Sequence, residues 1–167
     1  MAATWDVDLA ERVGAAMGQE FRGKGKSQAL GPSMDLDRDP RNGRSGETGG
    51  EDPLLNGRIT SALMRGIQST GCIATAKHFN CNHRENGRET NTITISQRLL
   101  MDQAGQQFRM AVQEGNAFSV MNAYNYVNGQ KCAENHNLLT SILRTAWGFP
   151  FYVVSDWGAV WNAGNAI

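Results

Sequence analysis

The chain alternates strand-like and helix-like segments, and this alternation restricts its fold more than any other feature. Strands are predicted at residues 28–30, 72–76, 117–121 and 151–155, where short apolar runs are bounded by turn residues. Successive strands begin roughly 35 to 45 residues apart, which leaves room for a crossover helix between each pair. The spacing therefore predicts parallel strands in one sheet.

Four amphipathic helices are predicted around these strands, at residues 9–23, 52–71, 96–115 and 137–148. Their apolar residues recur every three or four positions, as they do at Leu55, Ile59 and Leu63. Three of the helices begin with a polar residue that can cap a helix amino terminus: Asp52, Ser96 and Asn137.

The order of these elements is a helix, three repeats of strand and helix, and a final strand. This order predicts an α/β fold, namely a partial (β/α)8 TIM-type barrel with about four parallel strands and crossover helices. A complete barrel takes about 250 residues, and this chain has 167. The outer strands, at residues 28–30 and 151–155, should leave open sheet edges through which copies of the chain could associate.

The composition narrows the classes of partner. Lys+Arg and Asp+Glu both total 16, a balance that does not suggest nucleic acid or an anionic membrane surface as a partner. No apolar run approaches the roughly 20 residues of a membrane helix, and no signal peptide is visible, so the compartment is not indicated. The odd count of cysteines (Cys72, Cys81 and Cys132) lacks metal-ligand spacing and predicts buried thiols, with no metal or cofactor.

Polar and aromatic side chains follow the predicted strands, and the loops after the first three strands are long and polar (residues 31–52, 79–95 and 122–136). The candidates are Arg44, Lys77, His78, Tyr124, Asp156 and Trp157. In βα-barrels the loops at the carboxyl ends of the strands build the active site. Charged groups bind sugar hydroxyls strongly, and aromatic rings cover the apolar face of a pyranose. The pattern therefore predicts a carbohydrate site.

Simpler interpretations exist for several residues. Asp156 could cap the turn that follows its strand, and His78 could be a buried structural histidine. His83 and His136 are expected to face solvent, whereas Trp5 and Trp147 are expected in the core.

Two sets of charged residues stay ambiguous in the sequence. The group Arg84, Glu85, Arg88 and Glu89 could form exposed ion pairs of little energetic value, or could orient Lys77. Glu47, Glu51 and Glu114 could each be a proton donor, and nothing in the sequence singles one out.

Four segments together resemble glycoside hydrolase family 3, in that family's order and nearly its spacing. They are residues 31–53, Lys77-His78-Phe79 with residues 85–90, residues 119–129 and residues 147–159. The resemblance covers almost the whole chain and is strongest to the β-glucosidases of the family. It implies retaining hydrolysis of terminal non-reducing β-D-glucosyl residues, with a β-glucoside or a short oligosaccharide as substrate.

The resemblance also implies roles for the site residues. Asp156 matches the catalytic nucleophile, and Trp157 matches the indole that walls the sugar subsite. Arg44, Lys77 and His78 match groups that bind sugar hydroxyls, and Tyr124 matches a tyrosine near the nucleophile. In retaining enzymes a second carboxyl group, about 5–5.5 Å from the first, protonates the leaving group and then activates water.

The resemblance implies that residues 1–167 are the central-to-late part of a barrel. The early barrel strands, and the C-terminal α/β-sandwich domain that usually supplies the acid/base glutamate, would lie outside the chain. Residues 45–47 (Ser-Gly-Glu) replace a common Asn-Phe-Glu, and residues 80–83 (Asn-Cys-Asn-His) differ from the Pro-Gly-His-Gly of the β-N-acetylhexosaminidases. The alternatives are a β-xylosidase or α-arabinofuranosidase of the same family, or a non-catalytic sugar-binding remnant.

Overall fold

The computed structural model describes residues 1–160, and its centre is a four-stranded parallel sheet. The strands are β1 (Gln28–Ala29), β2 (Ile73–Phe79), β4 (Ser119–Asn122) and β7 (Tyr152–Ser155), which lie side by side in that order. All three pairings are parallel. The predicted partial barrel is confirmed: the strands form an open parallel sheet, with β1 and β7 at its edges within the described residues.

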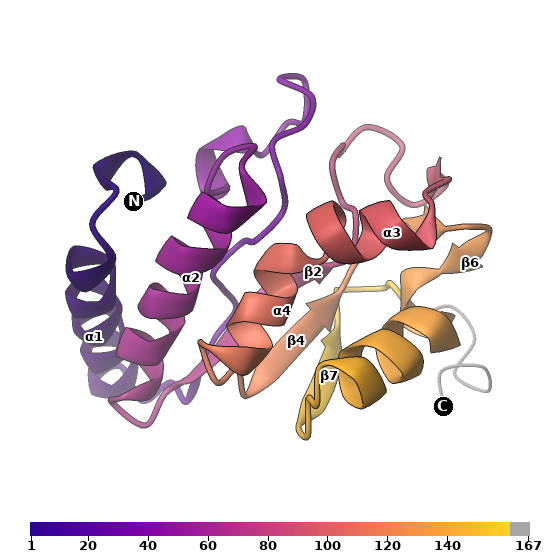
Figure 1. Ribbon diagram of the computed structural model, residues 1–167. Coiled ribbons are helices and arrows are strands. Elements are labelled where there is room, and N and C mark those ends of the chain that lie inside the picture. The colour runs from indigo at the N-terminus through magenta and orange to yellow at the C-terminus, as the bar shows by residue number, and fades with distance from the viewer. Residues whose placement is uncertain (161–167) are drawn as a thin grey trace.

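Helices lie beside the sheet as one layer, in front of the strands in Figure 1. The α-helices are α1 (Val7–Gly23), α2 (Pro53–Gln68), α3 (Gln97–Leu99) and α4 (Gln106–Gln113). Wider π-helical segments are η3 (Leu100–Ala104), which joins α3 to α4, and η5 (Asn137–Ala146) before β7. Short 3-10 turns occur at η1 (Ala2–Thr4), η2 (Ser45–Glu47) and η4 (Cys132–Glu134).

The two faces of the sheet differ in chemistry. Ala74, Ala76 and Val120 are fully buried in the main core cluster. The alternate strand positions are polar and include Gln28, Thr75 and Ser119. Gln28 Nε2 donates to Thr75 Oγ1 at 2.9 Å and to Ser119 Oγ at 3.4 Å. Alternate strand residues point to opposite faces, so this polar row lies on the face away from the core. Further along the same face come Lys77 and Met121, which line the cleft described below.

Aromatic rings fill the core between the sheet and the later helices. Phe79 meets Phe108 and Trp147 edge to face, with ring centroids 5.2 and 5.7 Å apart. Trp147 is only 5% exposed, as predicted. The prediction for Trp5 was wrong: it lies in the connection between η1 and α1 and is 76% exposed, because no element of the described chain covers it.

Helices α1 and α2 touch backbone to backbone. A Cβ atom placed on Gly66 would lie 2.0 Å from the Glu11 carbonyl oxygen, and one on Gly14 would lie 2.2 Å from the Leu63 carbonyl oxygen. Real Cβ atoms do not approach so closely, so these positions accept only glycine. Gly23, at the end of α1, faces open space.

The helix amino termini follow the prediction in two of three cases. Asp52 Oδ1 accepts from the Leu55 N–H at 2.8 Å, and Ser96 Oγ accepts from the Leu99 N–H at 3.3 Å. Asn137 was predicted to cap η5, but Asn135 does so instead, since its Oδ1 accepts from the Leu138 N–H at 3.1 Å.

A second, small sheet lies in segments that the sequence predicted as loops. Its strands are β3 (Thr92–Ile93), β5 (Tyr126–Val127) and β6 (Gln130–Lys131). Asn128 and Gly129 join β5 to the antiparallel β6 and both have positive φ, 51° and 83°, as a type I′ hairpin turn requires. The buried Lys131 Nζ donates to the carbonyls of Glu89 and Tyr124, both at 3.2 Å, and so ties this sheet to two loops of the site.

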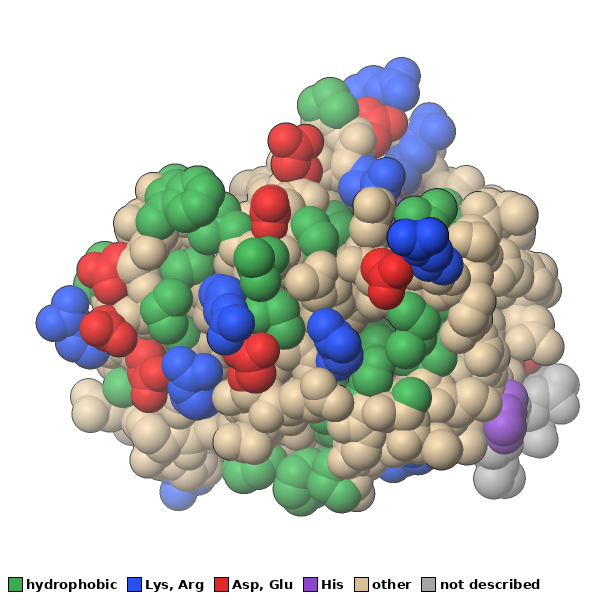
Figure 2. All heavy atoms as spheres, viewed as in Figure 1, with side chains coloured by type: hydrophobic (Ala, Val, Ile, Leu, Met, Phe, Trp, Pro, Cys, Tyr) green, Lys and Arg blue, Asp and Glu red, His purple; other side chains and the backbone are tan. Residues whose placement is uncertain are grey.

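The helix-covered surface carries acidic and basic side chains interspersed with one another (Figure 2). None of the helices in residues 1–160 combines the length and the apolar character needed to cross a membrane. Cys72, Cys81 and Cys132 are buried free thiols, as predicted. Burial raises the pKa of Cys132 to about 12 and raises the pKa of Cys81 as well.

Candidate active site

A cleft of about 350 Å³ lies at the carboxyl ends of β2, β4 and β7. Its walls are Leu30, Arg44, Lys77, His78, Glu85, Arg88, Met121, Tyr124, Asp156 and Trp157. All six predicted site residues are in this set. They come together because parallel strands end at one edge of the sheet, where their loops converge.

Asp156 follows β7 directly, and its two carboxylate oxygens have different surroundings. Oδ1 accepts from the Trp157 N–H at 2.8 Å, which shapes the turn after the strand. Oδ2 lies 3.4 Å from His78 Nε2, at the cleft wall. The side chain is 14% exposed. Asp156 therefore organises its turn with one oxygen and leaves the other available in the cleft.

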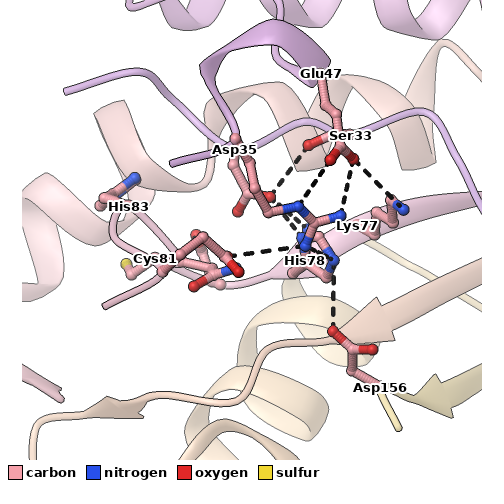
Figure 3. A network of polar contacts seen from close by, with 12 residues as sticks. Ser33, Asp35, Glu47, Lys77, His78, Cys81, His83 and Asp156 are labelled. Carbon is pink, nitrogen blue, oxygen red and sulfur yellow. Dashed lines mark hydrogen bonds and ion pairs between the residues drawn. The ribbon is translucent and has the colours of Figure 1, made fainter. Parts of the chain in front are cut away.

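Arg44 and Lys77 bring positive charge to the cleft, and Glu47 contacts both; Figure 3 shows its contact with Lys77. Arg44 donates to Glu47 through Nε at 2.9 Å and Nη2 at 2.8 Å, while Lys77 Nζ lies 4.0 Å from Glu47 Oε2. The hydrogen bond from Arg44 lowers the pKa of Glu47. Glu47 is therefore held as a carboxylate, which is the wrong form for a proton donor.

His78 is 2% exposed and is contacted at both ring nitrogens. Nδ1 lies 2.6 Å from Asp35 Oδ2. Nε2 lies 3.2 Å from Arg44 Nη1 and 3.4 Å from Asp156 Oδ2. The histidine thus links a buried carboxylate behind the site to a carboxylate within it, as the dashed lines in Figure 3 show.

The sequence analysis missed Asp35. It lies in the loop after β1, where Asp35, Asp37 and Asp39 occur at every second position, and the sequence does not distinguish them. In the structure Asp35 is buried against His78. Asp39 instead pairs with the exposed Arg41 at 2.9 Å, a contact that lowers the pKa of Asp39 to about 2.

Tyr124 closes another side of the cleft. Its hydroxyl donates to the carbonyl of Trp157 and so joins the loop after β4 to the segment after β7. Burial and, next, the negative charge of Asp156 raise the pKa of Tyr124, which keeps the phenol neutral and able to donate. The indole of Trp157 is 80% exposed at the cleft rim, where its faces are free to contact a ligand.

Glu85 and Arg88 line the cleft and are not a freely exposed ion pair. Arg88 Nη1 donates to Glu85 Oε2 at 2.6 Å, and the guanidinium stacks 4.1 Å from the Tyr124 ring centroid. Glu85 Oε1 lies 3.8 Å from Arg44 Nη1. The pair therefore contacts Tyr124 and Arg44, and Lys77 is contacted by Glu47 instead.

The remaining candidate residues lie away from the cleft. His83 was expected to face solvent, but it is half-buried with Nδ1 3.1 Å from the Leu36 carbonyl oxygen, and burial lowers its pKa. His136 is exposed, as predicted. Glu114 pairs with Arg58 at 2.5 Å, and Glu51 borders a groove near the start of α2. No metal-binding cluster of His, Cys, Asp or Glu occurs within residues 1–160.

Residues 1–166 match the family model described as the glycosyl hydrolase family 3 N terminal domain. The chain belongs to glycosyl hydrolase family 3. This family membership confirms the resemblance found in the sequence, and it accounts for the α/β fold of parallel strands and covering helices.

Curated relatives and solved structures of this family are similar along nearly the whole chain. β-Glucosidase B of Emericella nidulans is 38% identical over 167 residues, which are 100% of this chain and 20% of the relative. The thermostable β-glucosidase B of Acetivibrio thermocellus is 41% identical over 160 residues, 96% of this chain and 21% of the relative. The chain thus spans about a fifth of the length of these relatives.

The structural matches are equally extensive. The crystal structure of β-glucosidase from Kluyveromyces marxianus in complex with glucose has a TM-score of 0.97 at 38% identity, covering 99% of this chain and 20% of that one. β-Glucosidase 3B from Thermotoga neapolitana in complex with glucose has a TM-score of 0.92 at 42% identity, covering 93% and 22%.

Proposed function

We propose that this chain carries the nucleophile and the sugar-binding groups of a retaining β-glucosidase. The observation that carries the proposal is the convergence of Asp156 with Arg44, Lys77 and His78 in one cleft. The relatives named above are β-glucosidases, and two of the similar structures hold glucose. A terminal β-D-glucosyl residue of a glucoside or short oligosaccharide is the proposed substrate.

The proposed reaction has two displacements. In the first, a carboxylate oxygen of Asp156 bonds to the anomeric carbon while the bond to the aglycone oxygen breaks, and that oxygen takes up a proton. In the second, the oxygen of a water molecule bonds to the same carbon, loses a proton to a base and releases the Asp156 carboxylate. Two inversions leave the anomeric configuration retained.

The other groups bind the sugar through that reaction. Arg44 and Lys77 donate charge-assisted hydrogen bonds to hydroxyl groups, and His78 Nε2 lies beside the attacking oxygen. Trp157 offers an aromatic face to the ring. These contacts can strengthen as positive charge develops at the anomeric carbon. Contacts that are stronger in the transition state than in the bound substrate lower the barrier.

We propose that the proton donor lies outside this chain. Beside the cleft, Arg44 holds Glu47 as a carboxylate, which is the wrong form for a proton donor. Within the cleft, Arg88 Nη1 lies 2.6 Å from Glu85 Oε2, so this carboxylate is already paired. On this proposal residues 1–167 are the central-to-late part of a barrel, and the early strands and the acid/base-bearing domain belong to a longer protein.

A comparison of leaving groups tests the function. An aryl β-glucoside with an activated phenol needs little protonation, whereas cellobiose needs a proton donor. The chain alone should hydrolyse the first and not the second, and an aryl β-xyloside should react more slowly. Binding of glucose without cleavage of any substrate would instead identify a sugar-binding remnant. Preference for the xyloside would identify the β-xylosidase alternative.

A further inference from the structure

We infer that Asp35 is a positioning residue that fixes the tautomer and orientation of His78. Oδ2 of Asp35 is the meeting point of three donors: the His78 ring Nδ1 at 2.6 Å, the His78 backbone N–H at 3.2 Å and the Ser33 hydroxyl at 3.2 Å. An oxygen that already accepts from a backbone N–H and a hydroxyl is an acceptor for the ring as well. The proton of the neutral imidazole therefore lies on Nδ1.

A proton on Nδ1 determines what the other ring nitrogen can do. Nε2 is then an acceptor, and the Arg44 guanidinium, which can only donate, lies 3.2 Å away. The contacts with Asp35 and Arg44 agree with one tautomer, and the Asp156 carboxylate, at 3.4 Å, is the longer of the two contacts at Nε2. The acceptor nitrogen lies at the cleft wall, 3.4 Å from Asp156, and its single lone pair can accept either from Arg44 or from a sugar hydroxyl that takes the place of Arg44.

The position of Asp35 is itself fixed by the surrounding fold. The Met34 N–H donates to the Lys77 carbonyl at 2.6 Å, which holds this loop along β2. The buried Asn56 of α2 donates from Nδ2 to the Asp35 carbonyl at 3.2 Å. The backbone around Asp35 is therefore held by β2 on one side and by α2 on the other. This fixes the position of the Asp35 carboxylate, and with it the orientation of the His78 ring.

The other carboxylate oxygen shows that Asp35 does not serve stability alone. Oδ1 is buried and has no partner among the described residues. A buried polar atom without a hydrogen bond is unfavourable for folding. The residue is only 4% exposed, and an apolar side chain would avoid that cost but leave the His78 ring, the His78 backbone N–H and the Ser33 hydroxyl without their acceptor. Two of these three donors belong to His78, and we therefore assign Asp35 to the site.

The tautomer can be tested without any variant at Asp35. Long-range ¹H–¹⁵N spectra of histidine-labelled chain report which ring nitrogen is protonated, and the His78→Gln spectrum identifies the His78 signals. The proton should lie on Nδ1 in the wild type. Asp35→Asn, whose amide can also donate, should increase the share protonated on Nε2, and the neighbouring Asp39→Asn should not. A wild-type ring protonated on Nε2 would overturn the inference.

The functional part rests on the proposed function and needs a second measurement. Asp35→Asn should lower kcat/KM for an aryl β-glucoside, or the affinity for glucose, by about tenfold or more. In a His78→Ala background the same change should cost less than about twofold. Equal losses in both backgrounds would show that Asp35 does not act through His78. If the wild type neither binds nor cleaves glucosides, the proposed function fails, and the tautomer alone decides the inference.

Discussion

Asp156 Oδ2 and His78 Nε2 lie 3.4 Å apart although their strands, β7 and β2, are separated by β4 in the sheet. The contact spans the carboxyl end of β4, whose last residue, Asn122, is aligned with Phe79 of β2 and Ser155 of β7. Both side chains are largely shielded from water, at 14% and 2% exposure. The site therefore depends on the register of β2, β4 and β7, which aligns Phe79, Asn122 and Ser155, as well as on the residues that follow these strands.

Asp156→Asn should lower the turnover of aryl β-glucosides by several orders of magnitude. Asparagine keeps the shape and can still accept from the Trp157 N–H, so the fold should be unchanged while the proposed nucleophile is lost. Initial rates with an activated aryl glucoside test this, with thermal unfolding as the check on folding. Asp39→Asn is the matched control. A variant that keeps more than about a tenth of the rate, or loses less than about 1.4 kcal/mol of barrier stabilisation, would exclude this role.

Lys77→Met should weaken glucose binding by about 1.5–3 kcal/mol, because it removes a charge-assisted hydrogen bond and keeps most of the aliphatic stem. Isothermal titration with glucose measures the change. Lys26→Met, at an exposed position after α1, is the control and should bind as the wild type does. Unchanged affinity in Lys77→Met would remove this residue from the sugar site.

The stability contributed by Glu47 should depend on pH. Arg44 lowers the pKa of Glu47 in the folded chain, so this contribution is present above about pH 4.5. It should disappear as the pH falls through the lowered pKa. Half of the side chain is exposed, so the effect should be modest.

The measurement compares the unfolding temperatures of the wild type and Glu47→Gln between about pH 6 and about pH 3. The difference should shrink towards acid. Glu51→Gln, at an exposed position in the same loop, should show no such trend. A difference that grows in acid would contradict the assigned sign.

Gly66→Ala should destabilise the chain by about 1–3 kcal/mol, because the new methyl group meets the Glu11 carbonyl of α1. Gly23→Ala introduces the same group into open space, and should be neutral or stabilise by up to about 1 kcal/mol. Urea unfolding of the two variants gives the comparison. Equal effects would mean that the α1–α2 contact is not as close as described.

The open edges at β1 and β7 should make the isolated chain weakly stable or prone to associate. Size-exclusion chromatography at several concentrations and urea unfolding test this prediction. A monodisperse monomer with a cooperative transition near about 10 kcal/mol would contradict it.

Most of the large sheet could be predicted from the sequence, because hydrophobic periodicity indicates its strands and helices and the strand spacing indicates parallel pairing. The small sheet could not, since β3, β5 and β6 have two residues each and too few positions to show a period. The Asn128-Gly129 pair was the available signal.

The candidate site was predicted to a similar extent. The six residues that the sequence analysis proposed all line the cleft. Asp35 was missed because its partner, His78, lies 43 positions later in the chain, and only the folded structure separates it from the neighbouring aspartates. Trp5 was misassigned because composition alone does not show whether a covering element exists.

The side-chain hydrogen bonds of Gln28 bear on how the cleft loosens when the chain is warmed. Strand β1 has only two residues, and its alignment with β2 depends on backbone bonds such as the one from the Thr75 N–H to the Gly31 carbonyl and on the Gln28 amide that reaches Thr75 and Ser119. Water competes for such bonds more readily than for a buried apolar contact. The loop that carries Arg44 begins at this strand and should be the first part to loosen on warming, while the Asp156 end of the cleft keeps its shape. Recognition of the sugar would then fail at a lower temperature than the fold.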